Sequence, residues 1–170
     1  LEVSQGPVEV MRKLKSLIKP DGTLYLGTDN RLGLRYFCGE RDPYTDSVFD
    51  GIESYKYTPR SERTGRCYAR IEIERILQES GYSDPKFYSV FPGLEAAQLI
   101  FSDHYQSNEE LSIRYTPLYR QSDSVFMREE KLFADIGEMG MLSQMSNSYL
   151  IECTLDRHHT SVKSVSVSYD

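Results

Sequence analysis

The spacing of apolar residues near the start of the chain predicts a short helix followed by a buried strand. The helix carries one apolar stripe, with residues at i, i+4, i+7 and i+8, and Pro7 suits its first turn. The sequence Lys-Pro-Asp-Gly at 19–22 ends the helix, because proline cannot continue it and Asp-Gly favours a turn. Residues 23–26 then form a β-prone stretch with the length of a strand covered on both faces. The stripe consists of Val10, Leu14, Leu17 and Ile18.

Regular structure is predicted again after residue 68. Residues 69–80 have the spacing of an amphipathic helix, and Gly81 stands at its expected C-terminal cap. Two strand-like segments follow, at 86–91 and 97–101. The Pro-Gly pair between them makes a short connection, which favours an antiparallel pair at the edge of a sheet. The apolar face of the helix consists of Ile73, Ile76 and Leu77.

Residues 104–170 are expected to form a small α+β extension, which could be the start of a further domain. An amphipathic helix is predicted at about 125–142, with the charged residues 129–131 in solvent. An apolar strand is predicted at 147–155, and a last strand at the chain end, whose exposed edge would allow a homodimer. The helix face would consist of Phe126, Leu132, Phe133, Ile136 and Met139, and the last strand of Val165, Val167 and Tyr169.

A long segment with little periodicity, residues 31–68, separates the first strand from the next helix. Glycine, proline and Asp-Gly punctuate it, yet it holds seven aromatic residues, too many for a disordered linker. We interpret it as a lid or substrate-binding insertion. An ordered cover for the edge of the sheet is the alternative. The aromatic residues are Tyr36, Phe37, Tyr44, Phe49, Tyr55, Tyr57 and Tyr68.

Composition narrows the class of protein. The chain has 170 residues, a formal net charge of -6 and a pI near 5.2, without a clustered basic stripe, which argues against nucleic-acid binding. No apolar run is long enough to span a membrane and no secretory signal opens the chain, so a cytoplasmic protein is expected. Three widely spaced cysteines favour a reducing compartment. His158 and His159 have no third ligand at metal spacing, so they are expected to be solvated turn residues.

Three polar residues, Thr28, Asp29 and Asn30, follow the first strand directly. In open α/β sheets ligands bind outside the carboxyl ends of the strands, so these side chains would stand at a pocket. The alternative is that Asp29 and Asn30 only cap or turn the chain.

Residues 1–103 resemble the C-terminal half of a class I S-adenosylmethionine-dependent methyltransferase. The resemblance rests on the turn at 19–22, on Asn-Arg-Leu-Gly-Leu-Arg-Tyr-Phe-Cys-Gly at 30–39, on Phe-Asp-Gly-Ile-Glu-Ser-Tyr at 49–55 and on Ile-Phe-Ser-Asp at 100–103. These stretches are similar to methyltransferase modules of bacterial surface-polysaccharide proteins, which share a polypeptide with glycosyltransferase or kinase-like domains. The resemblance implies a partial Rossmann-like α/β sheet that closes with an antiparallel hairpin at 87–101, and it places Leu1 and Glu2 at the end of the fourth strand.

The same resemblance implies S-adenosylmethionine as the cofactor, held by a glycine-rich loop and by an acidic residue after the second strand. The sequence contains neither feature. Gly137 and Gly140 form the nearest glycine pair and lie inside a predicted helix. We therefore expect the chain to start in the middle of a domain and to bind the cofactor weakly or not at all.

The resemblance also implies roles for individual residues. Asp29, Asn30 and Glu2 are the candidate catalytic residues, because a carboxylate or amide at a strand end could hold an acceptor hydroxyl or accept its proton. The candidate substrate-binding residues, for an acceptor that carries phosphate or a stacked sugar, are Thr28, Arg31, Arg35 and Tyr36.

Two functions follow from these expectations. In the first, the chain is part of a methyltransferase that acts on a bacterial glycan or on its nucleotide-sugar or lipid-linked precursor. The chain alone is expected to be inactive, because the cofactor-binding half is absent. The second is a non-catalytic scaffold or carbohydrate-contacting module of a multidomain glycosyltransferase-type protein, with the tyrosine-rich insertion as its surface.

Overall fold

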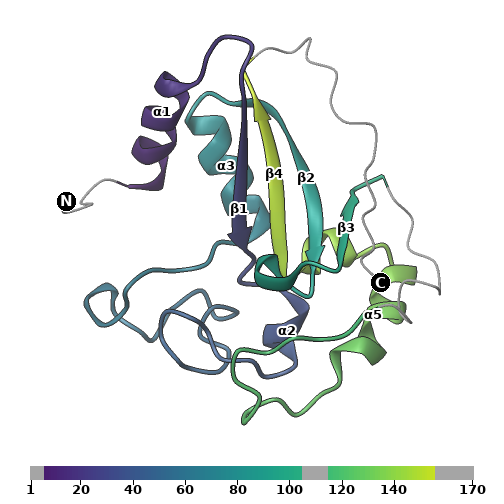
Figure 1. The fold of residues 1–170 in the computed structure, drawn as a ribbon. Helices are drawn as coiled ribbons and strands as arrows, with labels where there is room; N and C mark the ends of the chain where they lie inside the picture. The colour runs from purple at the N-terminus through teal and green to yellow at the C-terminus, as the bar shows by residue number, and fades with distance from the viewer. Residues whose placement is uncertain (1–5, 105–114, 156–170) are drawn as a thin grey trace.

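A computed structural model describes residues 6–104 and 115–155. Its centre is a four-stranded sheet in the order β1 (Thr23–Asp29), β4 (Ser148–Thr154), β2 (Ser83–Phe91) and β3 (Leu99–Ser102) (Figure 1). All three neighbouring pairs are antiparallel. Because β4 runs opposite to both of its neighbours, β1 and β2 point in the same direction, and their carboxyl ends lie at the same end of the sheet.

Helices complete a mixed α/β fold, as the sequence predicted. Within the described residues these are α1 (Pro7–Leu17), α2 (Leu34–Phe37), α3 (Arg70–Glu79), α5 (Glu129–Glu138) and α6 (Leu142–Met145), with two 3-10 turns, η1 (Arg60–Glu62) and η2 (Leu94–Ala96). The start of α3 is capped by Glu72, whose carboxylate accepts the backbone N–H of Ala69 at 2.7 Å. Its end is marked by Gly81, whose φ of 83° is a conformation that suits glycine.

Two apolar clusters hold these elements together. The first joins α1 and α3 to β2 and β4, with Leu24 and Leu26 of β1 packed against it. The second joins β2 and β3 to α2, α5 and α6 around Phe91, which is fully buried. Each large apolar side chain buried in this way stabilises the fold by about 1.5–3 kcal/mol. The buried members of the first cluster are Met11, Ile73, Leu77, Tyr82, Phe87, Tyr149, Ile151 and Cys153.

The antiparallel pair expected at 86–91 and 97–101 is confirmed as β2 and β3, and β3 forms one edge of the sheet. The strand expected at 147–155 is also present, as β4. It lies between β1 and β2, so this strand of the expected extension belongs to the same sheet as the N-terminal elements. The expected strand at 165–169, the turn at 157–159 and the expected strand end at Leu1 and Glu2 lie outside the described residues.

The helix expected at 125–142 is shorter, and one of its faces was predicted wrongly. It begins at Glu129, and Phe126 precedes it and is exposed. Met139 follows the last helical residue and is also exposed. Glu129, expected in solvent, is fully buried, because Tyr115 and Asn147 donate hydrogen bonds to its carboxylate.

The insertion at 31–68 folds around a buried tyrosine, Tyr55. Its hydroxyl donates to Asp42 at 2.7 Å and accepts the backbone N–H of Cys67 at 2.8 Å. Arg31 ties the insertion to α3, because its guanidinium donates to Glu72 at 2.7 Å and to two backbone carbonyls of the insertion, at residues 51 and 52. The segment is thus an ordered layer attached to the sheet end.

In the part of the chain that the structure describes, none of the helices combines the length and the apolar character that a membrane crossing would require.

Candidate functional site

The carboxyl ends of β1 and β2 meet long irregular segments of the described chain. Figure 1 shows α2, the insertion, η2 and the segment after residue 115 gathered at this end of the sheet. Asp29 closes β1, Glu95 lies in η2 and Arg120 belongs to the later segment. Elements far apart in the sequence therefore bring charged side chains together where an α/β sheet binds its ligands.

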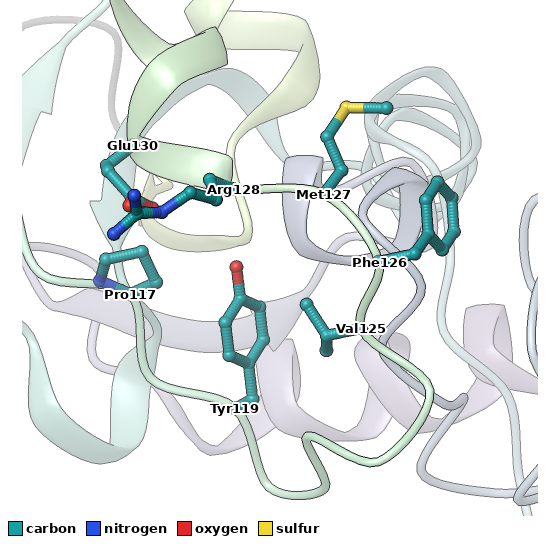
Figure 2. A pocket seen from close by; sticks show the side chains of 7 residues that line it. All are labelled: Pro117, Tyr119, Val125, Phe126, Met127, Arg128 and Glu130. Carbon is teal, nitrogen blue, oxygen red and sulfur yellow. The ribbon is translucent and has the colours of Figure 1, made fainter.

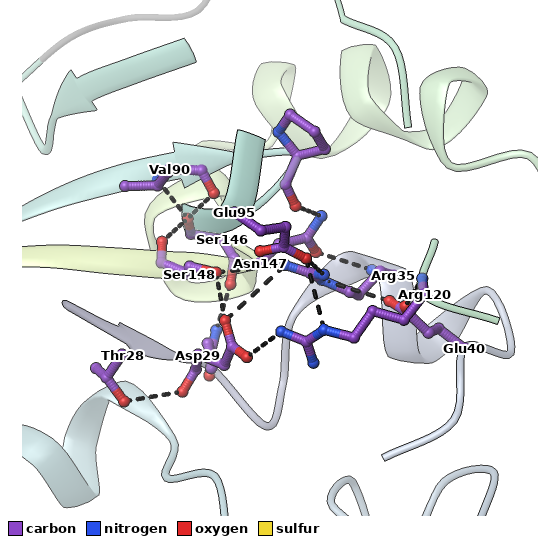
Figure 3. Close-up of polar contacts among 12 residues, drawn as sticks. Thr28, Asp29, Arg35, Glu40, Val90, Glu95, Arg120, Ser146, Asn147 and Ser148 are labelled. Carbon is purple, nitrogen blue, oxygen red and sulfur yellow. Dashed lines mark hydrogen bonds and ion pairs between the residues drawn. The ribbon is translucent and has the colours of Figure 1, made fainter. Parts of the chain in front are cut away.

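Asp29 is the central carboxylate of this charged cluster. One oxygen accepts the Ser148 hydroxyl at 2.7 Å, and the other accepts the Arg120 guanidinium at 2.9 Å (Figure 3). Burial raises the pKa of Asp29, but the Ser148 hydrogen bond and the charges of Arg35 and Arg120 outweigh it, so that the pKa lies below its ordinary value. Asp29 is therefore a carboxylate at neutral pH and a weak proton acceptor, better suited to orient a hydroxyl than to remove its proton.

Arg35 lies behind Asp29 and is completely buried. Its guanidinium nitrogens lie 3.1 Å from Glu95, 3.5 Å from Glu40 and 4.0 Å from Asp29. Arg120 adds a second positive charge, 3.6 Å from Glu95. Two arginines thus face three carboxylates, and burial raises the pKa of one of these, Glu40. Both arginines are already paired within the cluster, so it suits a neutral acceptor better than a phosphate.

Asn30 follows Asp29 but points into the protein. Its amide nitrogen donates to the Ser146 carbonyl at 2.8 Å, to the Gln144 carbonyl at 2.9 Å and to the Tyr149 hydroxyl at 3.0 Å. Its side-chain oxygen accepts the backbone N–H of Leu32 at 3.1 Å. All of its hydrogen-bonding groups are engaged and it is fully buried, so the geometry favours the turn-forming alternative over contact with a substrate.

The other sequence-derived candidates have different surroundings. Thr28 is half-buried, and its hydroxyl donates only to the Asp29 carbonyl, at 3.3 Å. Arg31 is engaged with Glu72 and the insertion, as described above. Tyr36 is buried beside Arg35, and burial raises its pKa strongly. Glu2 lies outside the described residues. The structure therefore groups Asp29 and Arg35 in one cluster and assigns Arg31 to a structural contact.

Sequence analysis missed several members of the cluster. Glu95 could have been suggested, since it follows the end of a predicted strand just as Asp29 does. Arg120 gave no signal, because it lies before the predicted helix at 125–142, in a stretch with neither helical nor strand periodicity. Ser148 and Asn147 were predicted only as part of a strand. Their place beside Asp29 depends on the pairing of β1 with β4, which sequence spacing does not specify.

A second buried network begins directly behind Arg35. The Asn147 side chain accepts the Arg35 backbone N–H at 2.9 Å and donates to the Pro92 carbonyl at 2.9 Å and to the Glu129 carboxylate. Tyr115 donates to the same carboxylate. Burial raises the pKa of Glu129, and the bonds from Tyr115 and Asn147 offset only part of that effect.

We expect Glu129→Gln to reveal this buried charge through the pH dependence of stability. A carboxyl group whose pKa is raised on folding binds more protons in the folded state, so stability falls as pH rises above its unfolded value of 4.5. The free energy of unfolding of Glu129→Gln should therefore improve relative to wild type as pH rises above 4.5, measured by urea titration.

Glu95→Gln is the control with the opposite sign. Burial raises the pKa of Glu95, but a backbone hydrogen bond and the charges of Arg35 and Arg120 lower it overall. The Glu95 carboxylate therefore stabilises the folded state at pH values above 4.5, and this stabilisation is lost as the pH falls below 4.5. A difference between Glu129→Gln and wild type that stays constant from pH 4 to 8 would contradict a raised pKa at Glu129.

The three cysteines, Cys38, Cys67 and Cys153, are buried free thiols. Burial raises the pKa of each to about 12, so none is a thiolate nucleophile at neutral pH. Among residues 6–104 and 115–155, no three histidine, cysteine, aspartate or glutamate side chains form a group that could hold a metal ion.

A separate pocket of about 370 Å³ opens between residues 117–119 and 125–130 (Figure 2), and one of its lining residues, Tyr119, directly precedes Arg120 of the charged cluster. The Tyr119 side chain projects into it, and Arg128 and Glu130 stand at its border.

The fold and the cluster define a mixed α/β protein with a charged site at the carboxyl ends of two co-directional strands. No protein-family model, no curated protein and no solved structure matches the chain.

Proposed function

We propose that this chain forms the acceptor-binding part of an S-adenosylmethionine-dependent methyltransferase that acts on a bacterial glycan or its precursor. The observation that carries the proposal is Asp29, held at the carboxyl end of β1 by Ser148 and Arg120 and still 17% exposed at its side chain. The common direction of β1 and β2, the helix α3 between them in the sequence and the antiparallel pair β2–β3 support it, because the resemblance implies a sheet that closes with an antiparallel hairpin at 87–101.

The chemistry required of this part of the protein is modest. The cofactor supplies an electrophilic methyl group, and the protein aligns the acceptor hydroxyl with it. A hydroxyl that donates to Asp29 would have its lone pairs directed away from the carboxylate. Arg120, 41% exposed at its side chain, can donate to a neighbouring sugar oxygen while it remains paired with Asp29. Arg35 fixes the position of both Asp29 and Glu95 from behind.

The resemblance implies that a glycine-rich turn between a strand and a helix holds the cofactor. The nearest glycine pair of the described residues does not form such a turn: Gly137 lies within α5, and Gly140 follows it with a φ of 69°. On this proposal the cofactor is held by residues outside the described chain. Calorimetric titration of residues 1–170 with S-adenosylmethionine should therefore show no binding heat, whereas micromolar binding would overturn this assignment.

The decisive test measures methyl transfer by the full-length gene product. Radiolabelled S-adenosylmethionine would be supplied with nucleotide-linked and lipid-linked sugars as acceptors. Asp29→Asn should lower the rate by about 10- to 100-fold, because it loses the fixed carboxylate that aligns the hydroxyl. Tyr57→Ala, at an exposed position of the insertion, should leave the rate within about 2-fold. An unchanged rate in folded Asp29→Asn would reject Asp29 as an acceptor-binding residue.

A non-catalytic carbohydrate-contacting module is the second candidate, and a specific observation favours it. Four aromatic side chains of the insertion are exposed: Tyr57 is 77% exposed, Tyr44 and Phe49 are each 39% exposed, and Phe37 is 37% exposed. Aromatic faces of this kind can pack against the C–H faces of sugars. Under this alternative, Tyr57→Ala should weaken glycan binding while full-length protein shows no methyl transfer to any acceptor.

A further inference from the structure

The pocket between residues 117–119 and 125–130 is formed by a loop whose path is fixed by contacts with α2 and the insertion. The Ser124 hydroxyl donates to the Gly39 carbonyl at 2.8 Å, and the Phe126 N–H donates to the Cys38 carbonyl at 3.1 Å. The Phe126 ring meets Phe49 edge-on, with centroids 6.1 Å apart. The pocket therefore exists without a ligand, as is usual for small-molecule sites.

Gly39 shows how closely this loop is packed. Its φ of 103° is a conformation that side chains rarely adopt. A Cβ atom at this position would lie 2.4 Å from the Ser124 carbonyl oxygen and 2.7 Å from the Phe126 ring. The absence of a side chain at Gly39 thus allows the segment after α2 to pack closely against Ser124 and Phe126. This contact fixes the position of Phe126, which lines the pocket.

The lining is divided between apolar and polar groups (Figure 2). Tyr119 offers an aromatic ring, and Arg128 and Glu130 form an ion pair at 2.9 Å on the border. The ion pair carries no net charge but can donate and accept hydrogen bonds. A neutral ligand with hydroxyl groups matches this border better than an ion, because the pair has no net charge. The apolar part of the lining consists of Pro117, Val125, Phe126 and Met127.

Tyr119 is connected to the interior of the protein. Its hydroxyl oxygen is buried without a hydrogen-bond partner among the described residues, and burial together with the charge of Glu129 raises the pKa of Tyr119. The hydroxyl therefore stays protonated and neutral. Arg120, the next residue, pairs with Asp29. One short segment thus joins the pocket to the proposed acceptor site.

We propose that this pocket binds a neutral sugar ring of the glycan acceptor, as a subsite next to Asp29. The proposal rests on the proposed function for the identity of the acceptor, and on the pocket itself for the class of ligand. A sugar ring has apolar C–H faces that suit Tyr119 and hydroxyl groups that suit the Arg128–Glu130 pair. The pocket volume is at the low end of the range for small-molecule sites, which suits a single small ligand.

Saturation-transfer NMR on residues 1–170 tests the proposal without the cofactor. The probes are methyl α-D-glucopyranoside, methyl α-D-galactopyranoside and methyl α-D-mannopyranoside, with inorganic phosphate titrated separately. At least one glycoside should bind with a Kd on the order of 1 mM, the affinity expected of so small a ligand. Tyr119→Ala should weaken binding about 10-fold, and Tyr119→Phe, which keeps the ring, should weaken it less. Binding of phosphate but none of the glycosides would overturn the proposal.

Two further variants separate a local effect from loss of folding and from other surfaces. Val125→Phe narrows the pocket from a partly exposed loop position, so it should weaken glycoside binding even if Tyr119→Ala does not fold. Tyr57→Ala should leave binding unchanged. If glycosides bind and only Tyr57→Ala abolishes binding, the pocket is not the subsite, although the methyl-transfer proposal stands. If glycosides bind through Tyr119 and the full-length protein transfers no methyl group, the pocket assignment stands alone.

Discussion

Replacement of Arg35 by methionine should lower the free energy of unfolding by about 3–5 kcal/mol, the loss typical when one partner of a buried ion pair is removed. The guanidinium is fully buried, and Glu40, one of its partners, is only 1% exposed. Without Arg35 this carboxylate has no other side-chain cation among its ion pairs, and Asp29 and Glu95 retain only Arg120. Urea denaturation followed by circular dichroism measures the loss.

Arg41→Met is the matched control for this prediction. Arg41 also pairs with a carboxylate, Asp123, but the two side chains are 31% and 65% exposed. Exposed pairs of this kind contribute about 0–1 kcal/mol. Equal losses for Arg35→Met and Arg41→Met would contradict the central role of Arg35. Arg35→Lys should fall between wild type and Arg35→Met, because one ammonium cannot face three carboxylates in the geometry of a planar guanidinium.

The second large effect is expected at Asn30. Asn30→Ala should lower the free energy of unfolding by about 2–4 kcal/mol, since it leaves the Ser146 carbonyl and the Leu32 N–H without their partner inside the protein. The Gln144 carbonyl loses one donor and keeps the Tyr149 hydroxyl. A residue that only contacted substrate would change activity and not stability. Thermal and urea unfolding of the variant distinguish these two roles directly.

Asn30→Asp adds a pH test to the same position. A carboxylate there would face two carbonyl oxygens at the distances now occupied by an amide N–H donor, 2.8 and 2.9 Å. Protonation of the new carboxyl group relieves this repulsion, so its folded pKa is raised and the variant should gain stability as pH falls through that pKa. Thr28→Ala is the neighbouring control, with an expected change within about 0.5 kcal/mol. A wild-type stability for Asn30→Ala would refute the structural role.

The elements that were predicted well are those whose pattern is local. The local spacing and the proline-containing turn predicted α1 and the start of β1, and Gly81 marks the end of α3. The predicted stripe was only half right: Leu14 and Ile18 pack on the core, whereas Leu17 is 80% exposed and Met11 is buried instead. The prediction that the first strand is covered on both faces was wrong, because β1 is the end strand of the described sheet and Tyr25 is 54% exposed. The β2–β3 pair followed from its short connection. The position of β4 did not follow, because a strand of apolar residues can pair with any free edge, and its register with β1 joins residues more than a hundred positions apart.

The burial of charged side chains was the second feature that could not be predicted from the sequence. Sequence patterning assigns Glu129 to solvent, since glutamate is almost never fully buried without partners. Tyr115 and Asn147, which supply those partners, lie in separate segments and meet it only in the folded chain. The candidate site shows the same division. Asp29 could be inferred from its place at a strand end, whereas Arg120, its closest charged partner, lies in a segment without periodicity.

The central position of β4 has a consequence for how this protein is made. During synthesis β1 and β2 leave the ribosome well before the strand that hydrogen-bonds to both of them. Until β4 emerges, the nascent chain presents two strands whose facing edges are unpaired, a state prone to wrong pairing and aggregation. The sheet can close only after residue 154 is available. The sheet is therefore expected to form late in synthesis and slowly, and chaperones are expected to bind β1 and β2 until then.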